Sequence, residues 1–128
     1  MSPWGHATVS RIGGATELDL ASQYPDGELS ARTTMWVVQV DKDLYVRSAR
    51  GPGSAWYRRA LAAGAGHLWA GGTDAAVLLV PVDPGEGDLH AAIDAAYHHK
   101  YDRYGPRIVG SVVGDHAAEV TIRLQARG

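Results

Sequence analysis

Alternating apolar and polar positions predict a chain built mainly of β-strands. Residues 17–20 alternate, and residues 28–40 form a longer stretch rich in β-branched and aromatic side chains, which favour strands. A Pro-Asp-Gly sequence at residues 25–27 is a strong turn signal between these two strands. A second turn at residues 41–43 precedes residues 44–48, which we expect to pair with the long strand as a hairpin.

Two predicted helices separate the remaining strands. The first covers residues 55–63 and follows Ser54, a favourable N-cap. The second covers residues 89–103 and follows Asp88. The other predicted strands lie at residues 67–70, 75–82 and 118–125.

The order of these elements indicates the fold class. Only one connection between neighbouring strands contains a short helix, and antiparallel hairpins dominate, which disfavours a doubly wound parallel sheet. We therefore predict one mainly β (α+β) domain over residues 1–128, a small, mostly antiparallel barrel of six strands with two helices.

Composition excludes several classes of site and partner. The chain has no cysteine, which excludes disulfides, thiolate zinc sites and a cysteine nucleophile. Its net charge of −2 gives no reason to expect nucleic acid or an anionic membrane as a partner. The longest apolar run, residues 75–82, is too short to span a bilayer, and residues 1–14 do not resemble a signal peptide. We expect a cytoplasmic protein.

The segment from residue 47 to residue 58 is the best candidate for binding an anion. A glycine loop that opens a helix presents free backbone N–H groups, and nearby arginines and hydroxyls add donors. An ordinary capped helix with solvated arginines is the alternative. A dinucleotide fingerprint is rejected because Trp56 stands where its third glycine would be and the repeated βαβ units are missing. The candidate residues are Arg47, Ser48, Gly51, Gly53, Ser54 and Arg58.

The second predicted helix carries candidates for acid–base chemistry. Tyr97, Lys100 and Tyr101 share one helical face, where the lysine would lower the pKa of a neighbouring phenol. The alternative is an amphipathic helix whose lysine extends past packed rings. His98 and His99 point about 100° apart on that helix, so no metal site is predicted.

Further aromatic side chains and one histidine are candidates for binding a substrate. Every large aromatic in this chain is a Trp or Tyr, which suits partly buried pocket walls and interfaces. As plain core residues they would need only a hydrogen-bond partner. The candidates are Trp36, Tyr45, Trp56, His67 and Tyr104.

These stretches together resemble the domain-of-unknown-function 2255 family of bacteria, over nearly the whole chain. That family resembles split β-barrel flavin-binding proteins, among them pyridoxamine-phosphate oxidases and deazaflavin-dependent nitroreductases. The resemblance implies a split barrel, a flavin or deazaflavin whose phosphate lies at residues 46–59, and an active site at a homodimer interface. The matching residues are Trp36-Val37-Val38, Asp43 to Ser48, Gly51, Ala55 to Arg58, Ala92 to Tyr97, Lys100, Tyr101, Arg103 and Tyr104.

Three functions are compatible with these residues and with the resemblance. The first is an oxidoreductase that binds a flavin or deazaflavin in a homodimer pocket, with Trp56, Trp69 and Tyr97 at the interface. The second is a cofactor-free cyclase, isomerase or dehydratase that acts on a small cyclic metabolite, and the third is a non-catalytic small-molecule binder. Nitroreductases usually have Lys or Arg at the helix start, where this chain has Ser54, Ala55 and Trp56, and that difference favours the second and third. The fold resemblance favours the first, which we rank first.

Overall fold

The computed structural model of this protein describes residues 4–127. Its strands are β1 (Leu18–Ser22), β2 (Thr33–Met35), β3 (Val38–Val40), β4 (Asp43–Arg47), β5 (Ala65–Ala70), β6 (Thr73–Pro81) and β7 (Thr121–Ala126). Its α-helices are α1 (His6–Gly13), α2 (Ala55–Ala63), α3 (Gly87–Tyr101), α4 (Pro106–Gly110) and α5 (Asp115–Ala118), with 3₁₀ turns η1 (Gly51–Gly53) and η2 (Asp102–Tyr104).

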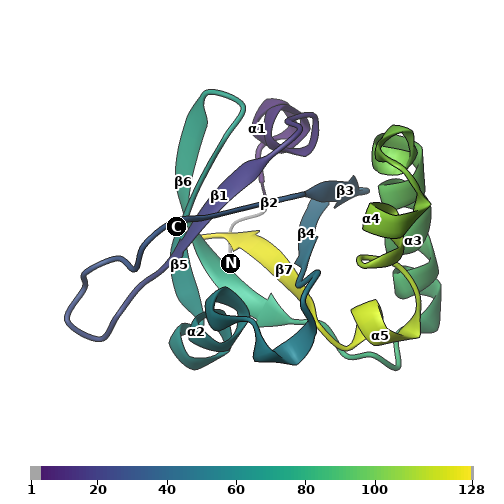
Figure 1. Ribbon diagram of the computed structural model, residues 1–128. Coiled ribbons are helices and arrows are strands. Elements are labelled where there is room, and N and C mark those ends of the chain that lie inside the picture. The colour runs from purple at the N-terminus through teal and green to yellow at the C-terminus, as the bar shows by residue number, and fades with distance from the viewer. Residues whose placement is uncertain (1–3, 128) are drawn as a thin grey trace.

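One antiparallel sheet forms the framework of the molecule. Its strands follow the order β2-β1-β5-β6-β7-β4-β3, and every neighbouring pair is antiparallel. The sheet curls into a half-barrel, with α1 at one end, α2 at the other and α3 to α5 along one side (Figure 1). The prediction of a mainly β, antiparallel barrel-like fold is confirmed.

The two edges of the sheet are joined directly by the chain. β2 and β3 lie at opposite edges, yet only Trp36 and Val37 separate them in sequence. Side chains of α3 replace the missing strand bonds at Val37, because its N–H donates to the Tyr101 hydroxyl (3.1 Å) and its carbonyl accepts from Lys100 Nζ (2.7 Å). The curl therefore closes at this two-residue bend.

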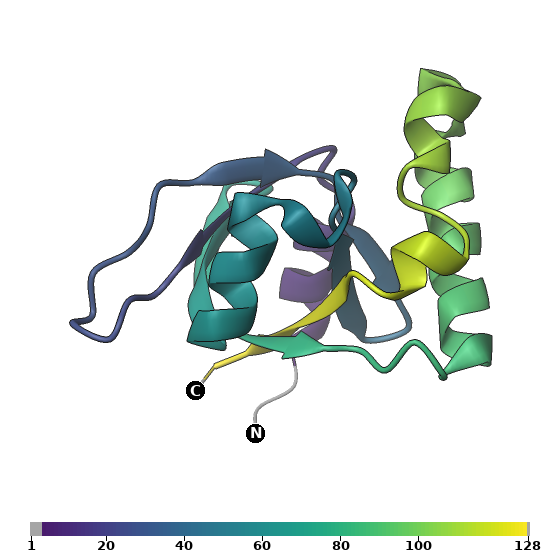
Figure 2. The ribbon, with the colours of Figure 1, turned by 60° about the horizontal axis from the view of Figure 1, so that its bottom comes forward.

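Hydrophobic residues form two clusters on either side of the β3–β4 hairpin. The first fills the half-barrel and contains Leu18, Leu44, Leu68 and Leu124. The second lies between the hairpin and α3 and contains Tyr45, Val82, Ile93, Tyr97 and Val109. Figure 2 shows α3 and α4 standing beside the barrel as a separate layer.

The predicted numbers of elements were wrong. The described residues form seven strands and five α-helices, not six strands and two helices. The expected strand over 28–40 is divided at the bend, and its first five residues contribute only an isolated bridge between Leu29 and Gln23. The expected strand over 118–125 starts later, at Thr121, because α5 ends at Ala118 and a two-residue turn follows it.

Helix α1 was not predicted, although it completes the core. Val9 and Ile12 are buried at helical spacing against the half-barrel. Trp4, just before the helix, donates its indole N–H to the Leu124 carbonyl at 2.8 Å. In the part of the chain that the structure describes, no helix is both long enough and apolar enough to cross a membrane.

Candidate functional site

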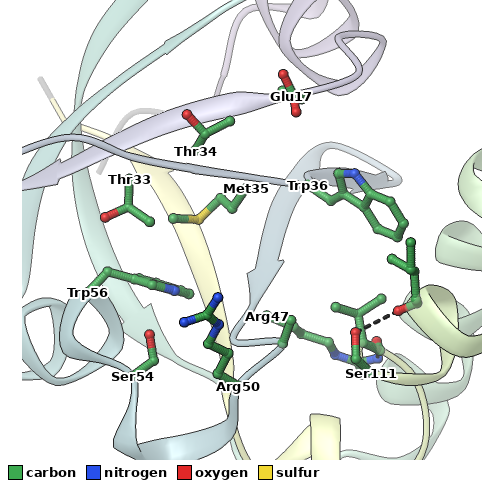
Figure 3. Close-up of a pocket in the computed structure, with 13 residues that line it drawn as sticks. Glu17, Thr33, Thr34, Met35, Trp36, Arg47, Arg50, Ser54, Trp56 and Ser111 are labelled. Atoms are coloured by element: carbon green, nitrogen blue, oxygen red, sulfur yellow. Dashed lines mark hydrogen bonds between the residues drawn. The ribbon is translucent and has the colours of Figure 1, made fainter.

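The main cavity lies where the bend between β2 and β3 faces the β4–α2 loop and α4, and it has a volume of about 500 Å³. That volume is in the range of small-molecule sites. Figure 3 shows the Arg50 guanidinium beside Trp56 and Met35, with Trp36 across the space. The residues that matter most for its chemistry are Thr33, Met35, Trp36, Arg50, Ser54 and Trp56, with Ile108, Ser111 and Val112 on the α4 side.

The β4–α2 loop places Arg50 at the edge of this cavity. Ser48 Oγ donates to the Gly51 carbonyl at 2.7 Å, and Gly51 adopts φ +79°, which a residue with a Cβ rarely takes. The resulting tight turn leaves Arg50 exposed at its tip. None of the ion pairs among residues 4–127 involves Arg50, so its positive charge is available to a ligand.

The first turn of α2 adds unpaired backbone donors beside Arg50. Ser54 precedes the helix but makes no side-chain capping bond. The first N–H groups of an α-helix have no intrahelical acceptor, and the helix dipole favours negative charge there. An anion at this end would meet those N–H groups, the Ser54 hydroxyl and Arg50.

Arg47 lines the same cavity but directs its hydrogen bonds into the protein. Its side chain has no exposed surface and pairs with the Asp94 carboxylate. Its guanidinium also donates to Thr121 Oγ1 (2.8 Å), the Val112 carbonyl (2.8 Å) and His90 Nδ1 (3.0 Å). The arginine is always a donor, so Nδ1 is the acceptor and His90 Nε2 carries the proton that it donates to the Asp83 carbonyl.

This network positions the α4 side of the cavity. Asp94, on α3, also accepts from the backbone N–H of Gly114 at 3.2 Å. Arg47 and Asp94 together therefore fix the segment from α4 to α5 at Val112 and Gly114. Arg47 therefore stabilises the α4 wall of the cavity, whereas Arg50 is positioned to bind a ligand in it.

An aromatic stack supports the opposite wall. Trp36 stacks on Tyr101 with ring centroids 4.0 Å apart and planes 6° from parallel. The Tyr101 hydroxyl donates to the Thr16 carbonyl (2.7 Å) while it accepts from Val37. Lys100 Nζ donates to the carbonyls of Gly13 and Val37, each at 2.7 Å. Tyr101 and Lys100 thus hold Trp36 in place.

The structure places the three acid–base candidates away from the main cavity's lining. Burial raises the pKa of Tyr97, and it raises the pKa of Tyr101 to about 12. These shifts are opposite to the lowering expected from Lys100, whose own pKa burial lowers to about 8. The Tyr97 hydroxyl is buried and has no hydrogen-bond partner among the described residues.

The remaining candidates occupy different parts of the molecule. Tyr45 is buried in the core beside α3, with its hydroxyl 3.3 Å from Arg123 Nε. His67 pairs with Asp74 (3.1 Å) on β5 and β6, outside the main cavity's lining. Tyr104 lies 5.6 Å from the Trp36 ring and is 43% exposed. Arg58 is exposed on α2.

Two further hollows lie along α2. The first, which we call the α2 groove, shares Thr33, Arg50, Ser54 and Trp56 with the main cavity and extends to Arg59. The second, which we call the second cavity, has a volume of about 410 Å³. It also borders Arg59 and is completed by Gln23, Tyr24, Pro25, Ala62 and Arg127.

Several lining residues were missed from sequence. Ile108 and Val112 follow Pro106 at helical spacing, a pattern that could have shown one more helical turn there. Met35 lies in a predicted strand, but the face of the sheet from which its side chain lines the cavity depends on the bend, which was not predicted. No local signal marks His90 as the partner of Arg47. Across residues 4–127 no group of three or more His, Cys, Asp or Glu side chains is placed to hold a metal.

Comparison with known proteins identifies relatives at two levels. The profile of a family described as an uncharacterized protein conserved in bacteria (DUF2255) matches residues 8–124. A search of curated proteins found no match.

Solved structures share the fold at low sequence identity. A protein of unknown function from Agrobacterium tumefaciens has 14% identity and a TM-score of 0.65; the match covers 96% of this chain but only 54% of that one. An F420 reductase has 18% identity and a TM-score of 0.56, over 99% of this chain and 97% of that one. A pyridoxamine 5′-phosphate oxidase-related, FMN-binding protein from Nostoc punctiforme has 15% identity and a TM-score of 0.51, over 98% and 80%.

Proposed function

We propose that this chain, which belongs to the DUF2255 family of bacteria, binds a flavin or deazaflavin in the main cavity and acts as an oxidoreductase on a small molecule. Similarly folded proteins include an F420 reductase and an FMN-binding protein. When bound, such a cofactor would supply hydride or electron transfer, while the protein binds and orients it.

The observation that carries this proposal is the position of Arg50. It has no ion pair among the described residues, lies next to the uncapped start of α2, and shares a cavity with the side chains of Trp36 and Met35. A cationic and N–H-rich end joined to an aromatic and thioether wall matches a ligand with a phosphate and a planar ring. Arg50 and Ser54 would hold the phosphate, and Trp36 would contact the ring.

The cofactor-free alternative has less support in this geometry. Tyr97 and Tyr101 are buried with raised pKa values, and Lys100 is bonded to two carbonyls. A phenol with a raised pKa is a weak acid at neutral pH, and its proton is rarely released. Tyr101 and Lys100 instead support the cavity wall at Trp36 and Val37, and Tyr97 is a buried residue of the second hydrophobic cluster.

We further propose that a second copy of the chain covers the exposed side of the main cavity. Ile108 lines the cavity and is 51% exposed, and Tyr104 is exposed next to Trp36. An interface there would bury both side chains and enclose the ligand. Tyr97, expected at the interface, has no exposed surface and cannot contact a partner in this conformation.

The test is titration of the purified protein with FMN, riboflavin and F420, followed by absorbance and fluorescence. We expect FMN to bind more tightly than riboflavin, and Arg50→Ala to weaken FMN binding about 10- to 100-fold by loss of a charged hydrogen bond worth about 1.5–3 kcal/mol. Riboflavin binding should change little in Arg50→Ala. Arg58→Ala, which removes an exposed arginine of α2, is the matched control and should leave FMN binding unchanged.

Two results would count against the proposal. Failure of FMN, riboflavin and F420 to bind would remove the flavin assignment. Equal binding of FMN and riboflavin, unaffected by Arg50→Ala, would show that the phosphate does not lie at α2.

A further inference from the structure

The second cavity has the lining of a site for a nucleotide rather than for a purely apolar ligand. It borders two arginines, Arg59 and Arg127, and the aromatic side chain of Tyr24, which is 45% exposed. Gln23 adds an amide whose oxygen accepts from Arg127 Nη1 at 2.9 Å. Arginines bind phosphate, and aromatic faces stack on bases.

Arg59 connects this cavity to the proposed flavin site. It borders both the α2 groove and the second cavity, and the groove shares Arg50, Ser54 and Trp56 with the main cavity. Arg59 Nε is buried and has no hydrogen-bond partner among the described residues. A buried donor without an acceptor is costly to the protein, and an anion in the groove would satisfy it.

The charge of this region is positive although the whole chain carries −2. Residues 44–73 contain Arg47, Arg50, Arg58 and Arg59 and no aspartate or glutamate. Because Arg47 is neutralised by Asp94, the remaining positive charge lies on α2 and the loop before it. The lining residues of the α2 groove and the second cavity include no carboxylate, whereas Glu17 lines the main cavity.

The spacing along α2 suits one extended ligand. Ser54 and Ala62 are eight residues apart, which is about 12 Å along a helix, and they border the main cavity and the second cavity respectively. A mononucleotide flavin would end near Ser54. A dinucleotide would continue past Arg59 towards Tyr24.

We propose that the second cavity binds the adenosine phosphate half of a dinucleotide cofactor, with Arg59 on its phosphate and Tyr24 against its base. This inference rests on the proposed function, because the flavin half of the same molecule occupies the main cavity.

The test compares FMN, FAD and ADP by calorimetry on the wild type, Arg59→Gln and Arg58→Gln. FAD should bind the wild type at least 10-fold more tightly than FMN. Arg59→Gln should weaken FAD 10- to 100-fold and FMN by a smaller factor, so that the preference for FAD falls. Arg58→Gln, the neighbouring exposed arginine, should change neither. If Arg59→Gln fails to fold, Arg127→Gln on the other wall should give the same loss.

Each contrary outcome points to a different failure. FMN binding without a preference for FAD, or equal effects of Arg58→Gln and Arg59→Gln, would overturn the second cavity's role while the flavin site stands. If neither FMN nor FAD binds, the proposed function fails, and the binding of ADP alone tests the role of the second cavity. ADP binding that Arg59→Gln abolishes supports the second cavity, and no ADP binding overturns it.

Discussion

Two arginines three positions apart take opposite roles, and strand geometry explains the difference. Successive side chains of a strand point to opposite faces. On β4, Leu44 and Val46 fill the half-barrel, so Tyr45 and Arg47 face α3. Arg50 follows the end of the strand, where the loop turns outward. Alternation therefore could have placed Arg47 on the face opposite Leu44 and Val46, but its burial depends on α3, which covers that face.

Removing the hydroxyl of Tyr97 or of Tyr101 tests what each contributes to the stability of the fold. Tyr97→Phe should leave the free energy of unfolding unchanged or raise it slightly, because it deletes a buried hydroxyl that has no partner among the described residues. Tyr101→Phe should lower it by about 1–2 kcal/mol, because its hydroxyl bonds to Thr16 and Val37. Urea unfolding followed by tryptophan fluorescence measures both values.

The Tyr97→Phe variant also distinguishes a structural role of Tyr97 from a role in acid–base catalysis. Once a substrate is found, turnover by folded Tyr97→Phe should match the wild type. A loss of about 100-fold or more without a change in stability would make Tyr97 an acid–base residue and contradict the assignment.

At the scale of elements, sequence predicted best where local signals were strong. Helix α2 begins after Ser54 and ends before Gly64, whose φ is +68°. Both boundaries can be predicted from these two residue types. The sequence does not indicate the bend at Trp36, because the residues around it have strand propensity. The backbone of Val37, which leaves the sheet at the bend, is hydrogen-bonded by Tyr101 and Lys100, more than 60 positions away. α4 and α5 are single short turns held by packing, which propensity does not predict.

The contact between α3 and the bend should make stability depend on pH. Burial lowers the pKa of Lys100 to about 8 from 10.5. Between these values the unfolded chain holds a proton that the folded chain has released, so the fold gains stability as pH rises through this window. Below about pH 8 both states are protonated, and the burial penalty is present in full.

The measurement is the free energy of unfolding of the wild type and Lys100→Met from pH 7 to pH 10. Stability of the wild type relative to Lys100→Met should rise between pH 8 and pH 10. The range stops at pH 10 because the buried tyrosines, with raised pKa values, destabilise the fold only above it. A difference that is flat or falls with pH would contradict the assigned role of Lys100.

At the scale of the whole molecule, the proposed homodimer can be tested through its mass. Light scattering should give twice the chain mass of 13.6 kDa at micromolar concentration. Ile108→Glu should give the monomer mass and weaken FMN binding, because it places a charge in the proposed interface. Leu61→Glu is the control, since Leu61 is 45% exposed but lies on α2. A monomeric wild type would contradict the homodimer.

The position of β7 has a consequence for the order in which the protein forms during synthesis. β3–β4 and β5–β6 are local hairpins, but β4 and β6 meet only through β7, which pairs Leu124 with both Leu44 and Leu79. Until that strand is translated, the strips of sheet on its two sides have no hydrogen bonds to each other. The second cavity also needs Arg127, which follows β7 directly, so it forms only after this strand has been translated, and the proposed dinucleotide can bind there only from that point.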